Sequence, residues 1–161
     1  MGKSLETAKG SVWAVFLTAY AVLVELIEAR LAQQGLPPLG WYDVLWALER
    51  ADGQRLRMNE LADKVVLSRS NLTRLVDRLE QAGLVERQRS EDDRRGAFAA
   101  LTAEGKAMRK RMWPVYQGSI RELFEDRISE TEAAVMGKAL RRVLDAARSG
   151  SVPDSKATDK R

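Results

Sequence analysis

One segment, residues 67–95, limits the fold of this 161-residue chain more than any other. In its first half, apolar residues recur three and four positions apart, which is the spacing of one buried helical face. These residues are Leu72, Leu75, Val76 and Leu79. Ser68 can cap the start of this helix, because its hydroxyl can accept a hydrogen bond from a backbone N–H one turn on. Gly83 can end the helix in the left-handed conformation, and a short strand and a charged loop are expected after it.

The opposite face of this helix is polar and contains side chains of the kinds that contact nucleic-acid base edges and phosphates. The polar residues are Arg69, Ser70, Asn71, Thr73, Arg74, Asp77 and Arg78. An ordinary solvated face has a similar composition, so the helix by itself leaves both interpretations open. A second basic element follows at once, with Arg87 and Arg89 before the charged loop and Arg94 and Arg95 at its end. The combination favours a nucleic-acid contact.

Five pieces of the chain resemble, in order and spacing, the winged helix-turn-helix of the MarR family of bacterial transcriptional regulators. The matching pieces are Glu60–Ala62, Leu67–Glu80, Gly83–Val85, Asp93–Arg95 and Leu101–Thr102. The resemblance extends over residues 12–144. It implies a mainly α fold with a small β-hairpin wing, in which N- and C-terminal helices join two subunits.

The resemblance also implies that the protein binds double-stranded DNA at a pseudo-palindromic operator, with a recognition helix in the major groove and the wing beside it. The candidate DNA-binding residues are Ser68, Arg69, Ser70, Asn71, Thr73, Arg74, Arg78, Arg87, Asp93, Arg94 and Arg95. In the family an Asp-x-Arg pair at the wing tip places its arginine in the minor groove, and Asp93 and Arg95 match that pair. A solvated charged hairpin is the alternative for the wing.

Composition excludes several chemistries. The chain has no cysteine and no histidine, which excludes disulfides, thiol redox sensing, Cys/His zinc sites and Ser-His or Cys-His catalysis. No acidic pair lies in an apolar setting, so we expect no enzyme, no cofactor and no metal. The net charge of +4 and the sequence pI of about 9.6 permit a polyanionic partner without requiring one.

Periodicity and capping signals predict the remaining elements. The expected helices cover residues 5–34, 40–51, 59–65, 69–82, 103–124 and 130–148, and the expected strands cover residues 56–58, 84–88 and 96–101. Asn59 is expected to delay the third helix by a residue, because the Met58 side chain cannot cap it. Pro114 is expected to kink or break the fifth helix. The sequence Ser129-Glu130-Thr131-Glu132 is a capping box for the last helix.

The order of these elements divides the chain into four expected parts. The expected parts are an N-terminal dimerisation helix (residues 1–34), a winged DNA-binding domain (35–101), C-terminal dimerisation helices (102–148) and a disordered tail (149–161). The first helix carries a broad apolar stripe that favours burial between subunits over a monomeric core. Thr18, Tyr20 and Glu25 interrupt its apolar run, so we expect no membrane span and a cytoplasmic protein.

Aromatic residues gather on the helices beside the winged region and suggest a sensing site. The candidate ligand-pocket residues are Trp13, Phe16, Tyr20, Trp41, Tyr42, Trp46 and Trp113. Many MarR-type proteins bind small aromatic acids or phenols between the dimer helices and the winged unit, and this binding releases DNA. The same aromatics are also compatible with an ordinary core, which is the more frequent role of aromatic clusters. Arg30, Arg55, Arg109 and Arg111 are possible partners for an anionic effector, whereas Ala99 and Ala100 replace an arginine that urate-responsive relatives have.

The sequence therefore predicts a homodimeric, DNA-binding repressor that a small aromatic or phenolic ligand releases. Two alternatives remain: a winged-helix module that binds a partner protein, and a ligand-independent regulator or activator. The arginine-rich helix face and Asp93-x-Arg95 argue against the protein-binding module.

Overall fold

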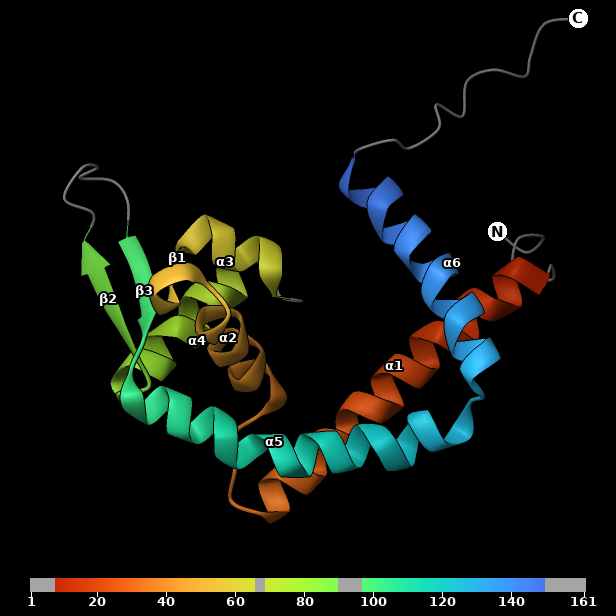
Figure 1. Ribbon diagram of the computed structural model, residues 1–161, viewed down its shortest axis with the longest axis horizontal. Coiled ribbons are helices and arrows are strands. Elements are labelled where there is room, and N and C mark those ends of the chain that lie inside the picture. Colours follow the sequence, from red (N-terminus) through yellow and green to blue (C-terminus); the bar gives the residue numbers. More distant parts are fainter. Residues whose placement is uncertain (1–7, 66–68, 90–96, 150–161) are drawn as a thin grey trace, which may run out of the picture. The chain divides into compact units, whose positions relative to one another are not determined.

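The computed structural model describes residues 8–65, 69–89 and 97–149 (Figure 1). Its elements are α1 (Ala8–Gln33), α2 (Leu39–Glu49), η1 (Asp52–Gln54), β1 (Arg55–Arg57), α3 (Met58–Lys64), α4 (Arg69–Gln81), β2 (Val85–Arg89), β3 (Ala97–Leu101), α5 (Ala103–Leu123), η2 (Glu125–Arg127) and α6 (Glu130–Arg148). The chain divides into two compact units, residues 1–120 and 121–161. The mainly helical fold with a small antiparallel sheet confirms the predicted fold class.

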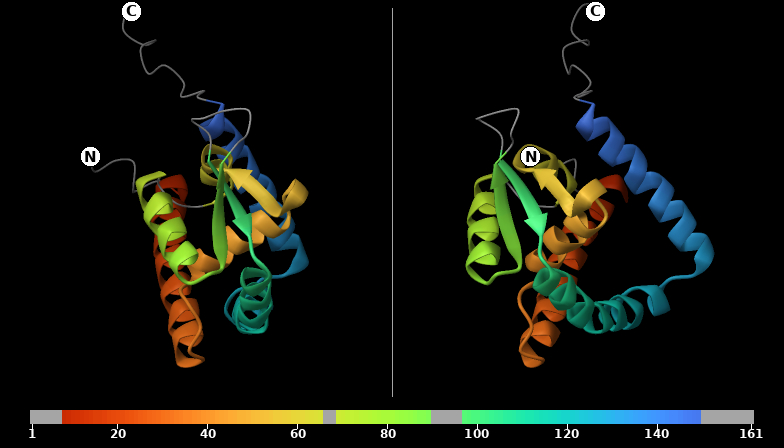
Figure 2. Two further views of the ribbon diagram at one scale, coloured as in Figure 1. Left: turned by 90° about the vertical axis from the view of Figure 1, so that its left-hand side faces the viewer. Right: turned by 60° about the vertical axis from the view of Figure 1, so that its left-hand side comes forward.

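A core that includes twelve buried residues of the described ranges holds α2, α3, α4 and the sheet together. Leu72, Val76 and Leu79 of α4 are in this core, as their spacing predicts, and Leu75 packs at its margin. Leu45 and Leu48 of α2 are fully buried in the same core. Figure 2 shows α4 alongside β2, so the helix that carries the polar face rests on the sheet.

The sheet has the strand order β1-β3-β2, with both pairs antiparallel. β3 is the central strand, and it pairs Phe98 with both Arg57 of β1 and Gln88 of β2. Successive side chains of a strand point to opposite faces. Leu56 and Ala99 therefore enter the core, while Arg57 and Phe98 belong to the outer face of the sheet.

Local backbone geometry and capping hydrogen bonds end α4 before Gly83 and begin α5 after Thr102. Gly83 has φ of +73°, and the Leu84 N–H donates to the Leu79 carbonyl at 2.9 Å, which confirms Gly83 as the helix stop. Thr102 caps α5, because its Oγ1 accepts from the Gly105 N–H at 3.0 Å and donates to the Gly83 carbonyl at 2.7 Å. A Cβ on Gly105 would lie 2.0 Å from the carbonyl oxygen of Leu84, the residue before β2, so only glycine fits where the first turn of α5 meets it.

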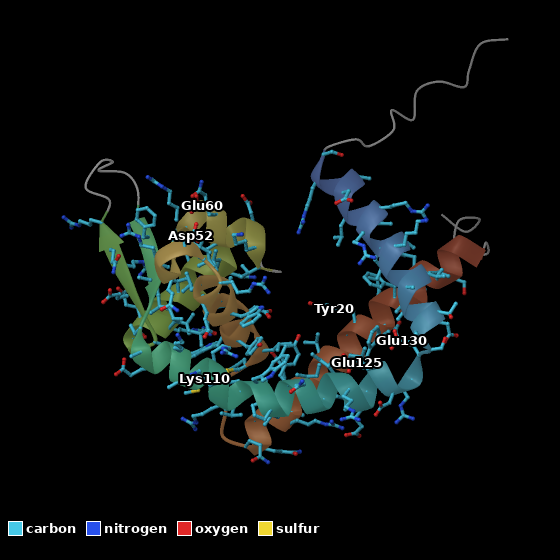
Figure 3. The ribbon with its side chains drawn as sticks, viewed as in Figure 1. Tyr20, Asp52, Glu60, Lys110, Glu125 and Glu130 are labelled. Carbon is cyan, nitrogen blue, oxygen red and sulfur yellow. The ribbon has the colours of Figure 1, made fainter. Side chains whose placement is uncertain are left out.

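One local prediction is wrong, and one alternative of a second is excluded. α3 begins at Met58 and not at Asn59, since the Glu60 carboxylate accepts from the Arg57 N–H at 2.9 Å and stabilises the earlier start; Glu60 is labelled in Figure 3. α5 continues through Pro114, so of the two expected effects of this proline the break does not occur, and the kink stays a prediction. Other boundaries differ from the predicted ones by a few residues. Ser68, the expected cap of α4, lies outside the described residues.

α1 buries only part of its apolar stripe in this chain. Ile27 and Leu31 are buried, whereas Val12 and Tyr20 are 68% and 53% exposed; Figure 3 labels Tyr20 on this helix. By length and composition alone, residues 10–33 are apolar enough to cross a membrane. The expectation that Thr18, Tyr20 and Glu25 would lower the apolar character below that level is therefore wrong. Core helices of soluble proteins meet the same criterion.

The capping box of α6 is present as predicted. The Glu132 carboxylate accepts from the Ser129 N–H at 2.8 Å, and the Glu132 N–H donates to the Ser129 hydroxyl at 3.3 Å. The hydrogen bonds from the Ser129 backbone and hydroxyl lower the pKa of Glu132. No residue of α6 is buried within this single chain, and Val135 and Val143 of its apolar side are exposed.

Candidate nucleic-acid interface

α4 presents an exposed polar face opposite its buried stripe. Asn71, Thr73, Arg74 and Arg78 are all exposed, and the helix begins at Arg69 and Ser70. The core fixes the rotation of the helix, because Leu72, Val76 and Leu79 are each at most 1% exposed. A helix held from behind in this way can present its polar face to the major groove.

Arg87 joins strand β2 to this helix. Its guanidinium lies 2.5 Å from an Asp77 carboxylate oxygen and 2.8 Å from Glu80 Oε2, and its backbone N–H donates to Glu80 Oε1 at 3.1 Å. Burial lowers the pKa of Arg87, but the hydrogen bonds that it donates to Asp77 and Glu80, together with their negative charges, outweigh this effect and raise the pKa overall. These contacts hold the base of the hairpin against the helix. A direct contact of Arg87 with DNA stays a prediction.

The hairpin strands lead to the predicted wing. Arg89, the last residue of β2, is exposed and pairs in register with Ala97, the first residue of β3. The predicted wing-tip contacts Asp93, Arg94 and Arg95 lie outside the described residues.

An aromatic cluster joins α2 to α5 beneath the winged region. The Tyr42 ring centroid lies 6.3 Å from that of Trp46, 5.9 Å from Trp113 and 4.9 Å from Tyr116. Three of the seven proposed pocket residues are therefore together, with Tyr116 added. Trp13 and Phe16 of α1 form a separate pair at 6.1 Å, and Trp41 packs against the core of the winged region. A role for any of the seven in ligand binding stays a prediction.

Charged groups surround this cluster. The Arg109 Nη2 donates to Glu49 Oε1 at 3.1 Å, and Arg109 Nε lies 2.5 Å from Glu49 Oε2 outside hydrogen-bonding geometry. The Arg109 guanidinium also lies 5.2 Å from the Trp46 ring centroid. This arginine is thus already compensated by a carboxylate. Burial raises the pKa of Asp43, and burial also raises that of Tyr116, to which the Asp43 charge adds.

The sequence pattern did not indicate the Glu49–Arg109 and Asp77–Arg87 ion pairs, because the partners are far apart in the chain. The available signal was position: Glu49 ends a helix whose neighbouring residues Trp46, Ala47 and Leu48 are apolar, and an acid in such a place needs a cation when it is buried. Asp43 and Phe98 were also missed, since neither belongs to a recognisable motif.

Comparison with known proteins agrees with this arrangement. A family model described as "MarR family" matches residues 34–96. The HTH-type transcriptional regulator MhqR of Bacillus subtilis is 30% identical over 129 residues, which are 80% of this chain and 86% of that protein.

Two crystal structures from Streptomyces coelicolor, both of MarR family transcriptional regulators, are also similar. AbsC has a TM-score of 0.80 at 31% identity over 89% of this chain and 97% of its own. Sco3205, solved in complex with DNA, has a TM-score of 0.81 at 32% identity over 87% and 88% of the two chains. The identity, coverage and exposed face of α4 lead to one conclusion: this chain belongs to the MarR family and is a DNA-binding transcriptional regulator.

Proposed function

We propose that this protein is a homodimeric repressor that binds a pseudo-palindromic operator and dissociates from it when a small aromatic or phenolic ligand binds. The observation that carries the proposal is the exposed polar face of α4. The opposite face of this helix is buried in the core, and Arg87 of β2 forms ion pairs with Asp77 and Glu80 of the helix. The solved complex of Sco3205 with DNA supports the same use of the fold.

In this proposal Thr73 and Arg74 contact bases in the major groove, and Asn71 and Arg78 contact phosphates or position the helix. Arginine can pair with guanine through two hydrogen bonds, and threonine can contact phosphate or the thymine methyl group. Arg69 and Ser70 at the start of α4 are the other proposed groove contacts, on the basis of the sequence. Arg95, oriented by Asp93, would enter the minor groove.

The dimer is proposed from the exposed apolar side chains of α1. Val12, Phe16 and Tyr20 recur at helical spacing and are 43–68% exposed in one chain. A second copy would cover them and place two α4 helices about one helical turn of DNA apart. A partner chain, rather than a membrane, would then cover α1, as suits a cytoplasmic regulator. The division into residues 1–34, 35–101, 102–148 and 149–161 stays part of this proposal.

The effector site is proposed at the cluster of Tyr42, Trp46, Trp113 and Tyr116. The cluster joins α2, which is part of the winged core, to α5, which leads out of it. A ligand that inserts between these rings would change how the two helices pack, and with it the spacing of the two α4 helices. Aromatic rings favour stacking with an aromatic ligand.

A DNA-binding experiment tests the proposal. We expect the purified protein to shift DNA from upstream of its own gene. Arg74→Ala should weaken binding and relax sequence preference, whereas Arg95→Ala should weaken it more than about tenfold and leave the dimer intact. Arg111→Ala, which removes an exposed arginine from α5, is the matched control. A folded dimer that shifts no such DNA at low salt would contradict the proposed function.

A thermal-shift screen with phenols and aromatic acids tests the effector, because a ligand that binds only the folded state raises the melting temperature. We expect a stabilising compound to release operator DNA as well, and Trp113→Leu to lose both responses. A compound that stabilises the protein and leaves DNA binding unchanged would argue against ligand-induced release.

A further inference from the structure

We propose that Arg55, Arg57 and Phe98 form a clamp that binds a phosphate of the operator backbone on the outer face of the sheet. This inference rests on the proposed DNA binding and adds a third contact to α4 and the wing tip. In this clamp the uncharged ring of Phe98 positions the two arginines.

The register of the sheet brings the three side chains together. Arg55 and Arg57 are two residues apart on β1, so both lie on the face opposite the buried Leu56. Arg57 is paired with Phe98 on the neighbouring strand, and Arg55 with Ala100. Ala100 leaves room for a long side chain to lie across the sheet, since it has only a methyl group.

Both arginines lie against the same ring. The guanidinium carbon of Arg55 is 4.9 Å from the Phe98 ring centroid, and that of Arg57 is also 4.9 Å from it. An exposed cation–π contact contributes about 0.5–1 kcal/mol and limits the orientations of the guanidinium. An anion that contacts both guanidinium groups would be attracted by two positive charges.

Nearby polar groups leave Arg55 available to such an anion. Its Nη1 donates to the neutral Gln88 amide oxygen at 3.3 Å, and the Gln88 amide in turn donates to the Glu86 carboxylate at 2.5 Å. Within the described parts of the chain, no carboxylate lies within ion-pair distance of Arg55. Glu86 thus interacts with Gln88 and not with Arg55.

The clamp lies at the end of the sheet from which the wing extends. Phe98 is the second residue of β3 after the wing, and Gln88 beside it is the last but one residue of β2 (Figure 1). A wing that enters the minor groove brings this end of the sheet close to the phosphates bordering that groove. The planar guanidinium matches phosphate through paired hydrogen bonds. The partner that fits is therefore the DNA backbone, and the contact carries no sequence information.

Salt dependence of operator binding tests the clamp. The logarithm of affinity falls linearly with the logarithm of salt concentration, and each phosphate contact contributes about one unit of slope. We expect the double variant Arg55→Gln/Arg57→Gln to lower the steepness by about one unit. Its affinity should fall by a similar factor for operator and unrelated DNA. Arg111→Gln, which removes one exposed charge elsewhere, should leave the slope unchanged.

Substitutions of Phe98 distinguish the positioning of the two arginines from the effect of their charge. Phe98→Leu keeps both arginines and should weaken binding several-fold at low salt, whereas Phe98→Tyr should bind like the unchanged protein. Melting temperatures of all variants identify any loss through unfolding, and the exposed Arg55→Gln variant remains informative if Phe98→Leu does not fold.

The outcomes distinguish this proposal from the one on which it rests. Absence of operator binding by the unchanged protein would overturn both. Normal binding with an unchanged slope in the double arginine variant would overturn the clamp alone. A loss confined to operator DNA would also overturn it, because that result would assign the arginines to bases and not to phosphates.

Discussion

The winged region and the terminal helix α1 bury their apolar residues in opposite ways. Among the described residues, twelve from α2, β1, α3, α4, the hairpin strands and the adjoining positions Val65 and Leu84 enclose one another in a continuous core. In α1, only Ile27 and Leu31 near its end are buried among the large apolar residues, and Val12, Val15 and Tyr20 are more than half exposed. The first region satisfies its own hydrophobic pattern, whereas the second leaves most of its large apolar side chains exposed.

The winged region and α1 therefore differ in their proposed roles: the first would bind DNA, and the second would form the dimer interface. Surface apolar residues are common singly, but a helix with this many in a row marks an interaction site. The winged region holds α4 through its own core, whereas in the proposed dimer the placement of two α4 helices would depend on what covers α1. Substitutions in the two regions should therefore fail in different ways.

The largest effect is expected from charges on α1. Val12→Asp/Phe16→Asp should separate the dimer, because two carboxylates would be buried in the proposed interface. Loss of bivalent binding should reduce operator affinity by about 100-fold or more. Sedimentation and fluorescence anisotropy measure the two effects.

Gln33→Glu, which adds a charge at an exposed position near the end of α1, is the control and should remain dimeric. A double variant that stays dimeric with full affinity would remove α1 from the interface and weaken the contrast between the two regions.

In the winged core we expect the opposite result: substitution should lower stability and leave dimerisation intact. Leu48 is fully buried there, and Leu48→Ala should lower the free energy of unfolding by about 3 kcal/mol through lost contacts and a cavity. The melting temperature should fall by about 10 °C, which chemical and thermal denaturation measure. The folded fraction should still dimerise. Equal loss of stability from Val135→Ala on α6, where the side chain is exposed, would show that the core is not confined to the winged region.

Local patterns predicted the fold well where each residue acts through its neighbours in sequence. The stripe of Leu72, Val76 and Leu79, the stop at Gly83 and the Thr102 cap all follow from helix geometry and were confirmed. The start of α3 was wrong, because Glu60 stabilises it from within the helix, a capping contribution that the prediction omitted.

The candidate site was less predictable, since its order comes from contacts between distant segments. The exposed face of α4 was expected, but the ion pairs of Arg87 depend on how β2 lies beside α4. The aromatic residues were counted together in the sequence, and the fold then divided them among α1, the core and the cluster around Tyr42. Spacing along a chain does not show which helices will meet.

A smaller effect is expected within the winged region, at the link between α4 and β2. Arg87→Gln should weaken operator binding by about tenfold, or 1.4 kcal/mol, because it frees the hairpin and leaves Asp77 and Glu80 uncompensated near DNA. Each partly exposed pair contributes little to stability, so the melting temperature should change only slightly.

Neutralising the carboxylates as well distinguishes a structural role of Arg87 from a direct contact of Arg87 with DNA. Asp77→Asn/Glu80→Gln in the Arg87→Gln background should recover part of the lost affinity if charge compensation and positioning are its role. If affinity is not recovered and the salt slope is lower by about one unit, Arg87 itself contacts a phosphate, as the sequence predicted.

The smallest effect is expected at Asp43, where the winged core meets α5. Burial raises the pKa of this carboxyl above its value in the unfolded chain, so the folded state binds more protons as the pH passes between the two values. Stability should therefore fall as the pH rises through that interval, which begins near pH 4. Asp43→Asn removes the penalty and should raise the melting temperature at pH 7 by about 2 °C, with no gain below pH 4. Glu28→Gln, at an exposed position on α1, should show no such pH-dependent gain. A gain for Asp43→Asn that is equally large at low pH would assign the effect to packing, because a protonated Asp43 carries no charge whose burial could be relieved.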